Sequence, residues 1–195
     1  MNFIAHRINT LAQLEQLPSQ YGAEVDLRDW ENELILAHNP FEKGENFERY
    51  LQHYHHGTLI LNIKSERIEP RVIELMEKYH ISDYFFLDSS VPMMYLLSEQ
   101  HNTRQAVRFS EIEPVELALA MKGRAQWVWV DCFSKFALTP KEYTQLKQAG
   151  FKLCLVSAEL QGRPEDIALH KKIIADNHFE FDAICTKVAY IPSWQ

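Results

Sequence analysis

The sequence predicts an α/β protein, a compact (β/α)8 (TIM) barrel with minimal loops and no inserted domain. Eight short runs rich in β-branched and aromatic residues alternate along the chain with segments whose apolar residues are spaced by three and four. Such alternation implies parallel strands joined by right-handed crossovers. An open doubly wound sheet usually carries a glycine-rich turn after its first strand, but residues 6–10 hold no glycine and the chain has only six. A count of eight strands also favours a sheet that closes into a barrel.

The expected strands share a high content of apolar and β-forming residues, and they are 3–7, 23–27, 58–64, 83–88, 105–110, 127–132, 152–157 and 182–187. Two helical patterns are the clearest: 70–80, with an apolar face from Val72 to Tyr79, and 165–177, with Ile167, Ile173 and Ile174. Helix starts are expected at the residues that favour the first turn: Thr10, Ser90, Pro114, Thr139 and Pro164.

The length predicts one domain over residues 1–195. Barrels of this kind typically need about 250 residues, so we expect short loops and a truncated or missing last helix after Tyr190. Trp127 and Trp129 are expected to pack inside the barrel rather than to stack on a sugar. His53, His55 and His56 precede Gly57, which we interpret as the cap of a helix C-terminus rather than part of a metal site.

Composition excludes several classes of function. The net charge of −7 argues against nucleic acid or an anionic membrane surface as the main partner, because both favour a basic surface. No apolar run is long enough for a membrane span, and residues 1–10 lack the apolar core of a signal peptide, so a cytoplasmic location is expected. Three scattered cysteines suggest neither a disulfide framework nor a zinc site.

Polar residues collect at the carboxyl ends of nearly all the expected strands, which is where the active site of this fold lies. The opposite ends mostly begin with aromatic or aliphatic residues, and this asymmetry favours a functional site over ordinary solvation. The residues at these ends are His6, Arg7, Glu24, Asp26, Asn62, Lys64, Asp88, Arg108, Asp131, Ser157, Glu159 and Lys187.

Among these residues, Glu24 and Asp26 are the clearest candidates for binding a cation together. Residues i and i+2 of a strand face the same side about 7 Å apart, so both carboxylates can converge on one hard cation. A purely structural alternative is that one of them pairs with Arg7 or Arg28. The spacing alone is common by chance, so its meaning depends on the surrounding motifs.

Those motifs are IAHRINT, GAEVDLRDWENELILAHNP, LILNIKSE and, more weakly, DAICTK. In this order they resemble the glycerophosphodiester phosphodiesterase family, within the phospholipase C-like barrel superfamily. The resemblance implies that His6 and His38 serve in acid–base catalysis and that Arg7 and Lys64 contact phosphate. It also implies that Glu24, Asp26 and the third-strand position, here Asn62, hold Mg2+ or Ca2+.

The sequence departs from the family pattern at three positions. Ile8 replaces a glycine, Asn39 replaces an aspartate, and Asn62 replaces a metal-binding carboxylate, which removes one negative charge. We therefore expect a weakened metal site. Asp88, Arg108, Asp131, Glu159 and Lys187 are candidate contacts to the substrate.

The resulting hypothesis is a metal-dependent phosphoric diester hydrolase acting on a small glycerol- or sugar-linked phosphodiester. The divalent cation, Arg7 and Lys64 would stabilise charge on the phosphoryl oxygens while the two histidines move protons. Two alternatives stay open. One is a degenerate barrel that binds a phosphorylated ligand, suggested by Asn62. The other is an aldolase or isomerase that uses Lys64 or Lys187 as a Schiff-base amine, which leaves the histidines and the two carboxylates without a common purpose.

Overall fold

The computed structural model describes all residues, Met1–Gln195, as a mixed α/β fold built on one curled sheet. The predicted alternation of strands and helices is confirmed, and each expected strand is present within a few residues of its expected bounds. The eight parallel strands are β1 (Asn2–Ala5), β2 (Gly22–Trp30), β5 (Leu59–Ile63), β6 (Tyr84–Leu87), β7 (Ala106–Phe109), β8 (Trp127–Val130), β9 (Lys152–Val156) and β10 (Ala183–Thr186).

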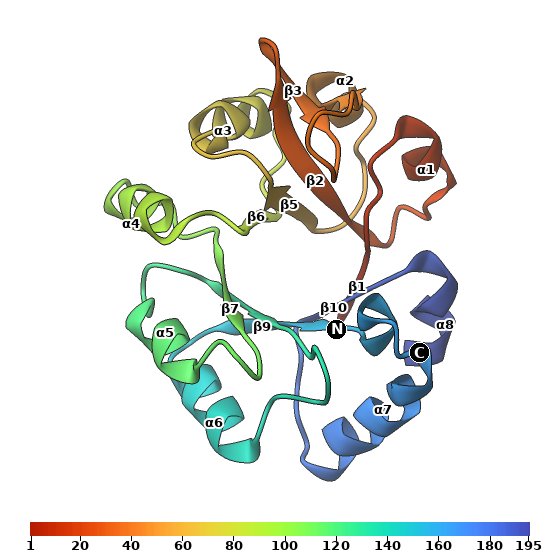
Figure 1. Ribbon diagram of the computed structural model, residues 1–195, viewed down its shortest axis with the longest axis vertical. Coiled ribbons are helices and arrows are strands. Elements are labelled where there is room, and N and C mark those ends of the chain that lie inside the picture. The colour runs from red at the N-terminus through yellow and green to blue at the C-terminus, as the bar shows by residue number, and fades with distance from the viewer.

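Helices lie on the outside of this sheet, with α1 to α4 in the upper half of Figure 1 and α5 to α8 in the lower half. They are α1 (Leu11–Gln16), α2 (Phe47–Leu51), α3 (Glu69–Lys78), α4 (Val91–Glu99), α5 (Val115–Ala120), α6 (Pro140–Gln148), α7 (Ile167–Asp176) and α8 (Ile191–Trp194). Short 3-10 turns complete the chain: η1 (Ala158–Gln161), η2 (Pro164–Asp166) and η3 (Val188–Tyr190).

Parallel pairing runs from β6 through β5, β2, β1, β10, β9 and β8 to β7. The two ends of this path, β6 and β7, meet at a single isolated bridge between Phe86 and Gln105. The joint between β6 and β7 is therefore far weaker than the others, and the sheet is curled without a complete ladder at that place.

One excursion was not predicted as separate elements. After Asp26, β2 continues to Trp30 and pairs antiparallel with β3 (Glu33–Leu36), which in turn pairs with the two-residue β4 (Glu45–Asn46). The turn at the tip contains Glu31 in the left-handed region, φ 55°. This excursion brings the segment that contains His38 back to the level of Asp26, because the Ala37 N–H donates to the Asp26 carbonyl at 2.9 Å.

The helix starts follow the predicted residues. Thr10 and Thr139 form capping boxes at α1 and α6, and the Ser90 hydroxyl accepts from the Met93 N–H at α4. Pro164 begins a 3-10 turn instead of α7 itself. The last helix is truncated to the four residues of α8, as expected.

The interpretation of Gly57 as a helix cap was wrong. The helix before it, α2, ends at Leu51, and the Gly57 N–H donates to the Tyr21 carbonyl at 2.9 Å on the way into β5. A Cβ at position 57 would lie 3.2 Å from the Gly22 nitrogen, so the close approach of two chain segments explains the glycine. Among the three nearby histidines, His56 contacts the Leu17 carbonyl at 2.8 Å.

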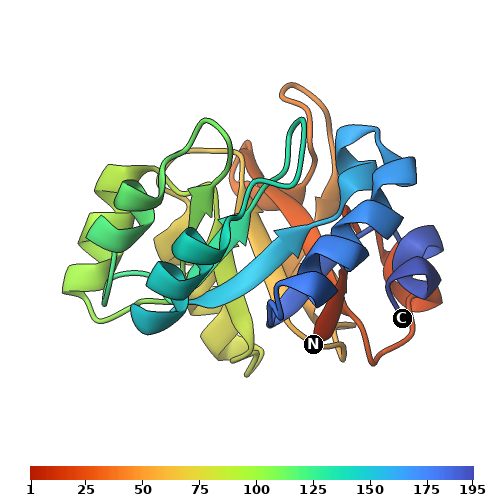
Figure 2. The same cartoon turned by 90° about the horizontal axis from the view of Figure 1, so that it is seen from below.

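Three apolar clusters hold the fold together. One of 24 buried residues lies under α1 to α4, one of 21 lies under α5 to α7 with Met94 of α4, and one of 11 fills the concave inside of the sheet. Helix α4 therefore joins the two outer clusters, since its Met93 and Leu97 belong to the first. Loops near residues 40, 110 and 135 rise together on one side of the sheet (Figure 2), above the carboxyl ends of the strands.

Candidate active site

Five predicted side chains gather at the carboxyl ends of β1, β2 and β5: His6, Glu24, Asp26, Asn62 and Lys64. Asp26 and Asn62 are partners in register on neighbouring strands. The His6 N–H donates to the Thr186 carbonyl and the Lys64 N–H donates to the Leu27 carbonyl, at 2.9 and 2.8 Å, so both residues continue their strands by one bond. The strand order therefore brings together residues that are up to 58 positions apart in the sequence, from His6 to Lys64.

Asp26 is fully buried and lies at the centre of this group. Its Oδ1 lies 3.0 Å from His38 Nδ1 and 3.6 Å from Lys64 Nζ, and its Oδ2 lies 3.8 Å from Arg7 Nε. Burial alone would raise the pKa of Asp26. Hydrogen bonds from His38 and Asn9 together with the Lys64 charge outweigh burial, so the pKa lies below its ordinary value. Asp26 is thus a carboxylate that holds three cationic or proton-bearing side chains in place.

Glu24, also buried, has a different environment. Its Oε2 accepts the Arg7 backbone N–H at 2.8 Å and its Oε1 accepts from Asn62 Nδ2 at 2.8 Å. Burial, followed by the nearby Asp26 charge, raises the pKa of Glu24 to about 7. Two neighbouring carboxylates therefore differ in pKa: that of Asp26 lies below its ordinary value and that of Glu24 above it.

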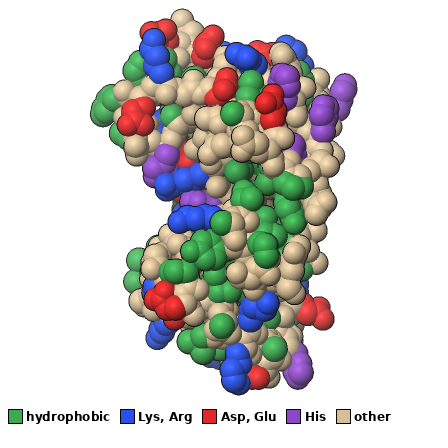
Figure 3. Space-filling model, turned by 90° about the vertical axis from the view of Figure 1, so that its right-hand side faces the viewer, with side chains coloured by type: hydrophobic (Ala, Val, Ile, Leu, Met, Phe, Trp, Pro, Cys, Tyr) green, Lys and Arg blue, Asp and Glu red, His purple; other side chains and the backbone are tan.

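The two histidines have different surroundings. Burial, and next the charge of Arg7, lowers the pKa of His6 to about 4, and its Nε2 lies 3.8 Å from Glu24 Oε2. The His38 ring lies between Arg7 Nη2 at 2.9 Å from its Nε2 and Asp26 at its Nδ1. A guanidinium can only donate, so Nε2 accepts and Nδ1 carries the proton. Figure 3 shows histidine and basic side chains gathered around a hollow at the left edge of that view.

Arg7 and Asp88 carry backbone strain. Both have positive φ, 56° and 62°, in the left-handed region that favours glycine. Strained non-glycine residues of this kind are concentrated at functional sites. Arg7 takes this conformation directly after β1, which lets its N–H reach Glu24 while its side chain reaches His38 and Asp26.

A chain of ion pairs extends the group to the other side of the sheet. Lys64 Nζ lies 3.3 Å from Asp88 Oδ2, and Arg108 binds both Asp88 oxygens, with Nε at 2.6 Å and Nη2 at 3.0 Å. Arg108 Nη1 then donates to Asp131 Oδ2 at 3.0 Å. Hydrogen bonds and charge from Arg108, with help from Lys64, outweigh burial and hold the pKa of Asp88 below its ordinary value.

Glu159 and Lys187 lie apart from this chain. The Glu159 carboxylate is buried and accepts from the Ser157 hydroxyl, from Thr186 Oγ1 at 2.6 Å and from the Lys187 N–H at 3.0 Å. Trp194 Nε1 donates to Ser157 Oγ at 2.7 Å, so this network fastens α8 to the sheet. The side chain of Lys187 is exposed and forms no ion pair. Substrate contact by either residue stays a prediction.

Two contributors were missed from the sequence. Asn9 clamps Asp26, because its Nδ2 donates to Oδ2 at 2.9 Å while its Oδ1 accepts the Asp26 N–H at 2.8 Å. Gln161 donates to Asp131 Oδ1 at 2.7 Å from η1. The polar Asn9 between the His6-Arg7 pair and the helix start predicted at Thr10 was a usable signal.

No group of three His, Cys, Asp or Glu side chains is arranged to hold a metal ion. The oxygen set nevertheless fits a hard cation held by two carboxylates, Glu24 and Asp26, and one amide. Asn62 Oδ1 is buried and has no hydrogen-bond partner, so an acceptor is available next to Glu24. A third carboxylate, which would strengthen the site, is absent.

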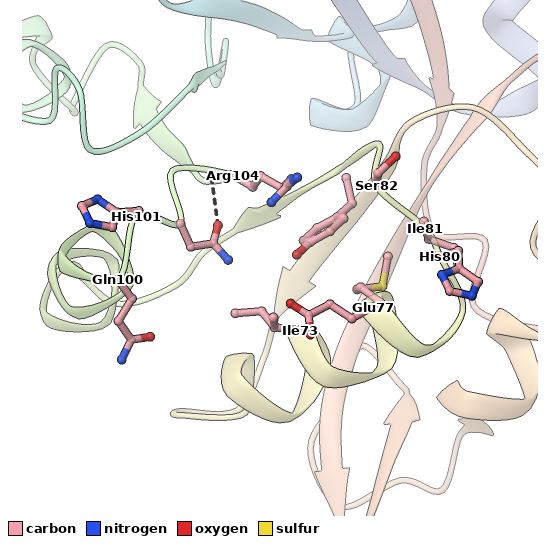
Figure 4. A pocket seen from close by; sticks show the side chains of 11 residues that line it. Ile73, Glu77, His80, Ile81, Ser82, Gln100, His101 and Arg104 are labelled. Carbon is pink, nitrogen blue, oxygen red and sulfur yellow. Dashed lines mark hydrogen bonds between the residues drawn. The ribbon is translucent and has the colours of Figure 1, made fainter.

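The amino-terminal side of the strands carries a separate groove of about 590 Å3 between α3 and α4. Figure 4 shows Arg104, Ser82, His80 and His101 among the side chains that line it, and the Arg104 N–H bonded to Asn102. Its lining residues come from α3, from the segment between α3 and β6 with Tyr84, and from the segment between α4 and β7. The groove therefore opens away from the carboxyl ends at which the candidate active site lies.

No protein-family model matches the chain, and no curated protein matches it in sequence. Among solved structures, the chain is similar to a glycerophosphodiester phosphodiesterase from Agrobacterium tumefaciens str. C58. The TM-score is 0.64, and the alignment covers 95% of this chain and 96% of that one. The two proteins share a fold. Because only 16% of the residues are identical, the similarity establishes the architecture and confirms the predicted structural resemblance. No helix has the length and apolar character that a membrane crossing requires.

Proposed function

We propose that the protein is a metal-assisted phosphodiesterase that cleaves a small glycerol- or sugar-linked phosphodiester, with His6 and His38 as the acid–base pair. The observation that supports this most directly is the arrangement around Asp26. One buried carboxylate orients His38, lies close to Lys64 and Arg7, and shares a strand face with Glu24 beside His6. This set supplies proton-transfer groups and cations in one place, as phosphoryl transfer needs.

Arg7 and Lys64 would bind the phosphate. In the absence of substrate Arg7 donates to His38 Nε2, and an anionic phosphate would compete for the same guanidinium. When Arg7 turns to the phosphate, His38 Nε2 becomes free to accept the proton of the attacking hydroxyl or water. Its Nδ1–H bond to Asp26 stabilises the positive charge that then develops.

His6 would complete the reaction on the other side of the phosphorus. In the free site the pKa of His6 is about 4, and the negative charge of a bound phosphodiester beside the ring would favour its protonated form. As the bond from phosphorus to the leaving oxygen breaks, His6 would give this proton to that oxygen, and solvent exchange would restore both histidines. A divalent ion held by Glu24, Asp26 and Asn62 Oδ1 would supply charge neutralisation for the phosphoryl oxygens. We further propose that the curled sheet works as a closed, compact (β/α)8 barrel, with β6 and β7 meeting at the Phe86–Gln105 bridge.

Asn62 favours a second candidate, a barrel that binds a phosphorylated ligand without cleaving it. Its amide donates to the carboxylate with which it would have to share a cation. A Schiff-base enzyme is less well supported, because Lys64 lies between Asp26 and Asp88 and both carboxylates stabilise its charged form.

The deciding experiment is a screen of the purified protein against phosphodiesters of glycerol, sugars and amino alcohols, with Mg2+, with Ca2+ and with EDTA. We expect turnover of at least one glycerol- or sugar-linked diester that EDTA abolishes and added metal restores. Absence of turnover across the panel, together with saturable binding of glycerol phosphate, would support the ligand-binding candidate instead. Turnover that EDTA leaves unchanged would contradict the proposed requirement for a divalent metal ion.

A further inference from the structure

Trp129 carries a polar atom with no partner inside the protein. It lies on β8 with only 4% of the residue exposed, and its indole N–H is buried and makes no hydrogen bond. An unsatisfied buried donor destabilises the folded state, so such groups are rare without a cause. Trp127, two residues earlier on the same strand, is not among the buried donors that lack a partner.

The strand register places Trp129 next to the candidate active site. It is the direct partner of Arg108 on β7, and Asp131 follows it by two residues on the same face. Arg108 is 29% exposed, so the residue paired with Trp129 in the strand register reaches solvent. Following the strand pairings from β2, β8 is the fourth strand reached whether one goes through β1 or through β5 and the β6–β7 bridge. Trp129 therefore lies on the opposite side of the curled sheet from Glu24 and Asp26.

The charges around Trp129 favour a neutral ligand group over a second phosphate. Arg108 is matched by Asp88 and Asp131, both within 3.0 Å, and Gln161 donates to Asp131 from above. This trio carries a net charge of −1, from two carboxylates and one guanidinium. A hydroxyl suits it, because it can accept from an indole N–H and donate to a carboxylate at the same time. An ammonium group could not accept from the indole.

We propose that Trp129 is a specificity-determining residue, whose indole N–H donates to a hydroxyl oxygen of the neutral polyol that esterifies the phosphate. This rests on the proposed phosphodiesterase function. The phosphate would lie at Arg7, Lys64 and the two histidines, and the terminal hydroxyl of the polyol would extend toward β7 and β8. The predicted packing role of Trp129 is kept, since the ring also belongs to the apolar cluster inside the sheet.

The kinetic test compares two substrates and two variants. The 4-nitrophenyl esters of glycerol phosphate and of 2-hydroxypropyl phosphate both keep the hydroxyl next to the ester carbon, but only the first has the terminal hydroxyl. The wild type should prefer the glycerol ester. Trp129→Phe keeps an aromatic ring but loses the N–H, so this preference in kcat/KM should fall about 3- to 10-fold, mainly through KM. An unchanged preference in Trp129→Phe overturns the proposal.

Trp127→Phe is the matched control. Trp127 lies on the same strand and face and stacks on Phe85 with ring centroids 4.6 Å apart, on the side away from the carboxyl ends. It should keep the wild-type preference. If both variants lost the preference equally, the effect would be one of packing and the proposal would fail.

A binding measurement separates this inference from the proposed function. The protein has four tryptophans, so 15N labelling gives few indole N–H resonances, and Trp129→Phe assigns one of them. Titration with glycerol 3-phosphate should shift the Trp129 resonance strongly, whereas propyl phosphate should not. This shift without turnover of any diester would reject the enzyme and keep the polyol site. Turnover without the shift would reject the polyol site and keep the enzyme.

Discussion

In the half of the sheet formed by β1, β2, β5 and β6, buried and exposed polar groups crowd around one carboxylate, Asp26. In the half formed by β7 to β10, the polar groups at the same level are fewer, and Arg108 of β7 pairs with Asp131 after β8 and with Asp88 after β6. The first half has histidines, an unpaired amide oxygen and a carboxyl whose pKa is raised to about 7. We therefore expect the proposed proton transfer in the first half and the proposed contact to the polyol in the second.

The two halves are also held together unequally. Four residue pairs join β1 to β10, whereas one isolated bridge joins β6 to β7. The Lys64–Asp88–Arg108 ion pairs cross this weak joint at the carboxyl side, since they run from β5 to β7. A network that resembles a substrate-binding set thus also fastens the sheet where its backbone pairing is weakest.

The largest expected effect is on catalysis in the first half. His6→Ala and His38→Ala should each reduce phosphodiester turnover by about 100-fold or more, because each removes a proton-transfer group. Thermal stability should change little. The double variant should be hardly worse than either single one, as expected of groups that act as a unit. His55→Ala, an exposed histidine outside the site, is the control. Near-normal turnover in either single variant would remove that histidine from the mechanism.

The next effect concerns the cation. Asn62→Glu should lower the Kd for Mg2+, Mn2+ or Ca2+ because it restores a negative charge beside Glu24 and Asp26. Calorimetric titration of wild type and variant measures this. Gln105→Glu, which adds a carboxyl to another buried amide position, controls for added charge. Equal or weaker binding by Asn62→Glu would exclude Asn62 from the metal ligands.

The ion pairs across the weak joint should matter for stability. Arg108→Ala removes the guanidinium that joins Asp88 to Asp131, so the free energy of unfolding should fall by about 1.5–3 kcal/mol. Arg124→Ala breaks a more exposed pair with Glu99 and should cost about 0.2–1 kcal/mol. Urea denaturation of both variants measures the difference. If both variants lost the same free energy of unfolding, the Arg108 ion pairs would stabilise the β6–β7 joint no more than an exposed surface pair does.

A pH effect should arise in the second half. His170 of α7 is buried, neither ring nitrogen has a partner, and burial followed by the Arg163 charge lowers its pKa. Below pH 6.5, the ordinary pKa of histidine, His170 binds a proton in the unfolded chain but not in the folded chain. The free energy of unfolding therefore falls as the pH decreases. His170→Leu should remove this loss of stability. Its free energy of unfolding should exceed that of the wild type by more at pH 5 than at pH 7.5. His53→Gln, at an exposed position, should leave the pH profile of urea denaturation unchanged.

The smallest effect tests the helix ends of both halves. His80, His101 and His178 follow α3, α4 and α7 in the left-handed region, with φ of 55°, 63° and 53°. Replacing each by glycine should stabilise the protein by about 1 kcal/mol, since left-handed backbone costs other residues about 1–2 kcal/mol. His53→Gly, at a position without positive φ, should not stabilise. A loss of stability in all three variants would show that the histidine side chains contribute contacts that outweigh the strain.

Much of the fold and part of the site could be predicted from the sequence. The period of the apolar residues determined eight strands and their alternation with helices, because burial of one face is a local property of each segment. The roles predicted for His6, Glu24 and Asp26 depended on the resemblance to a known family, because the spacing of the two carboxylates alone is common by chance. These residues lie close together because they belong to one strand or to two adjacent strands.

Tertiary structure alone decided which partners those residues have. That Asn9 clamps Asp26, that Arg7 donates to His38 and that Glu159 fastens α8 depend on side-chain directions and strand order. The raised pKa of Glu24 and the unpaired indole of Trp129 likewise depend on burial. Residue types and spacings determine what a segment can form. Electrostatics and hydrogen bonding across segments act over a few ångströms in space, and only the folded chain fixes those distances.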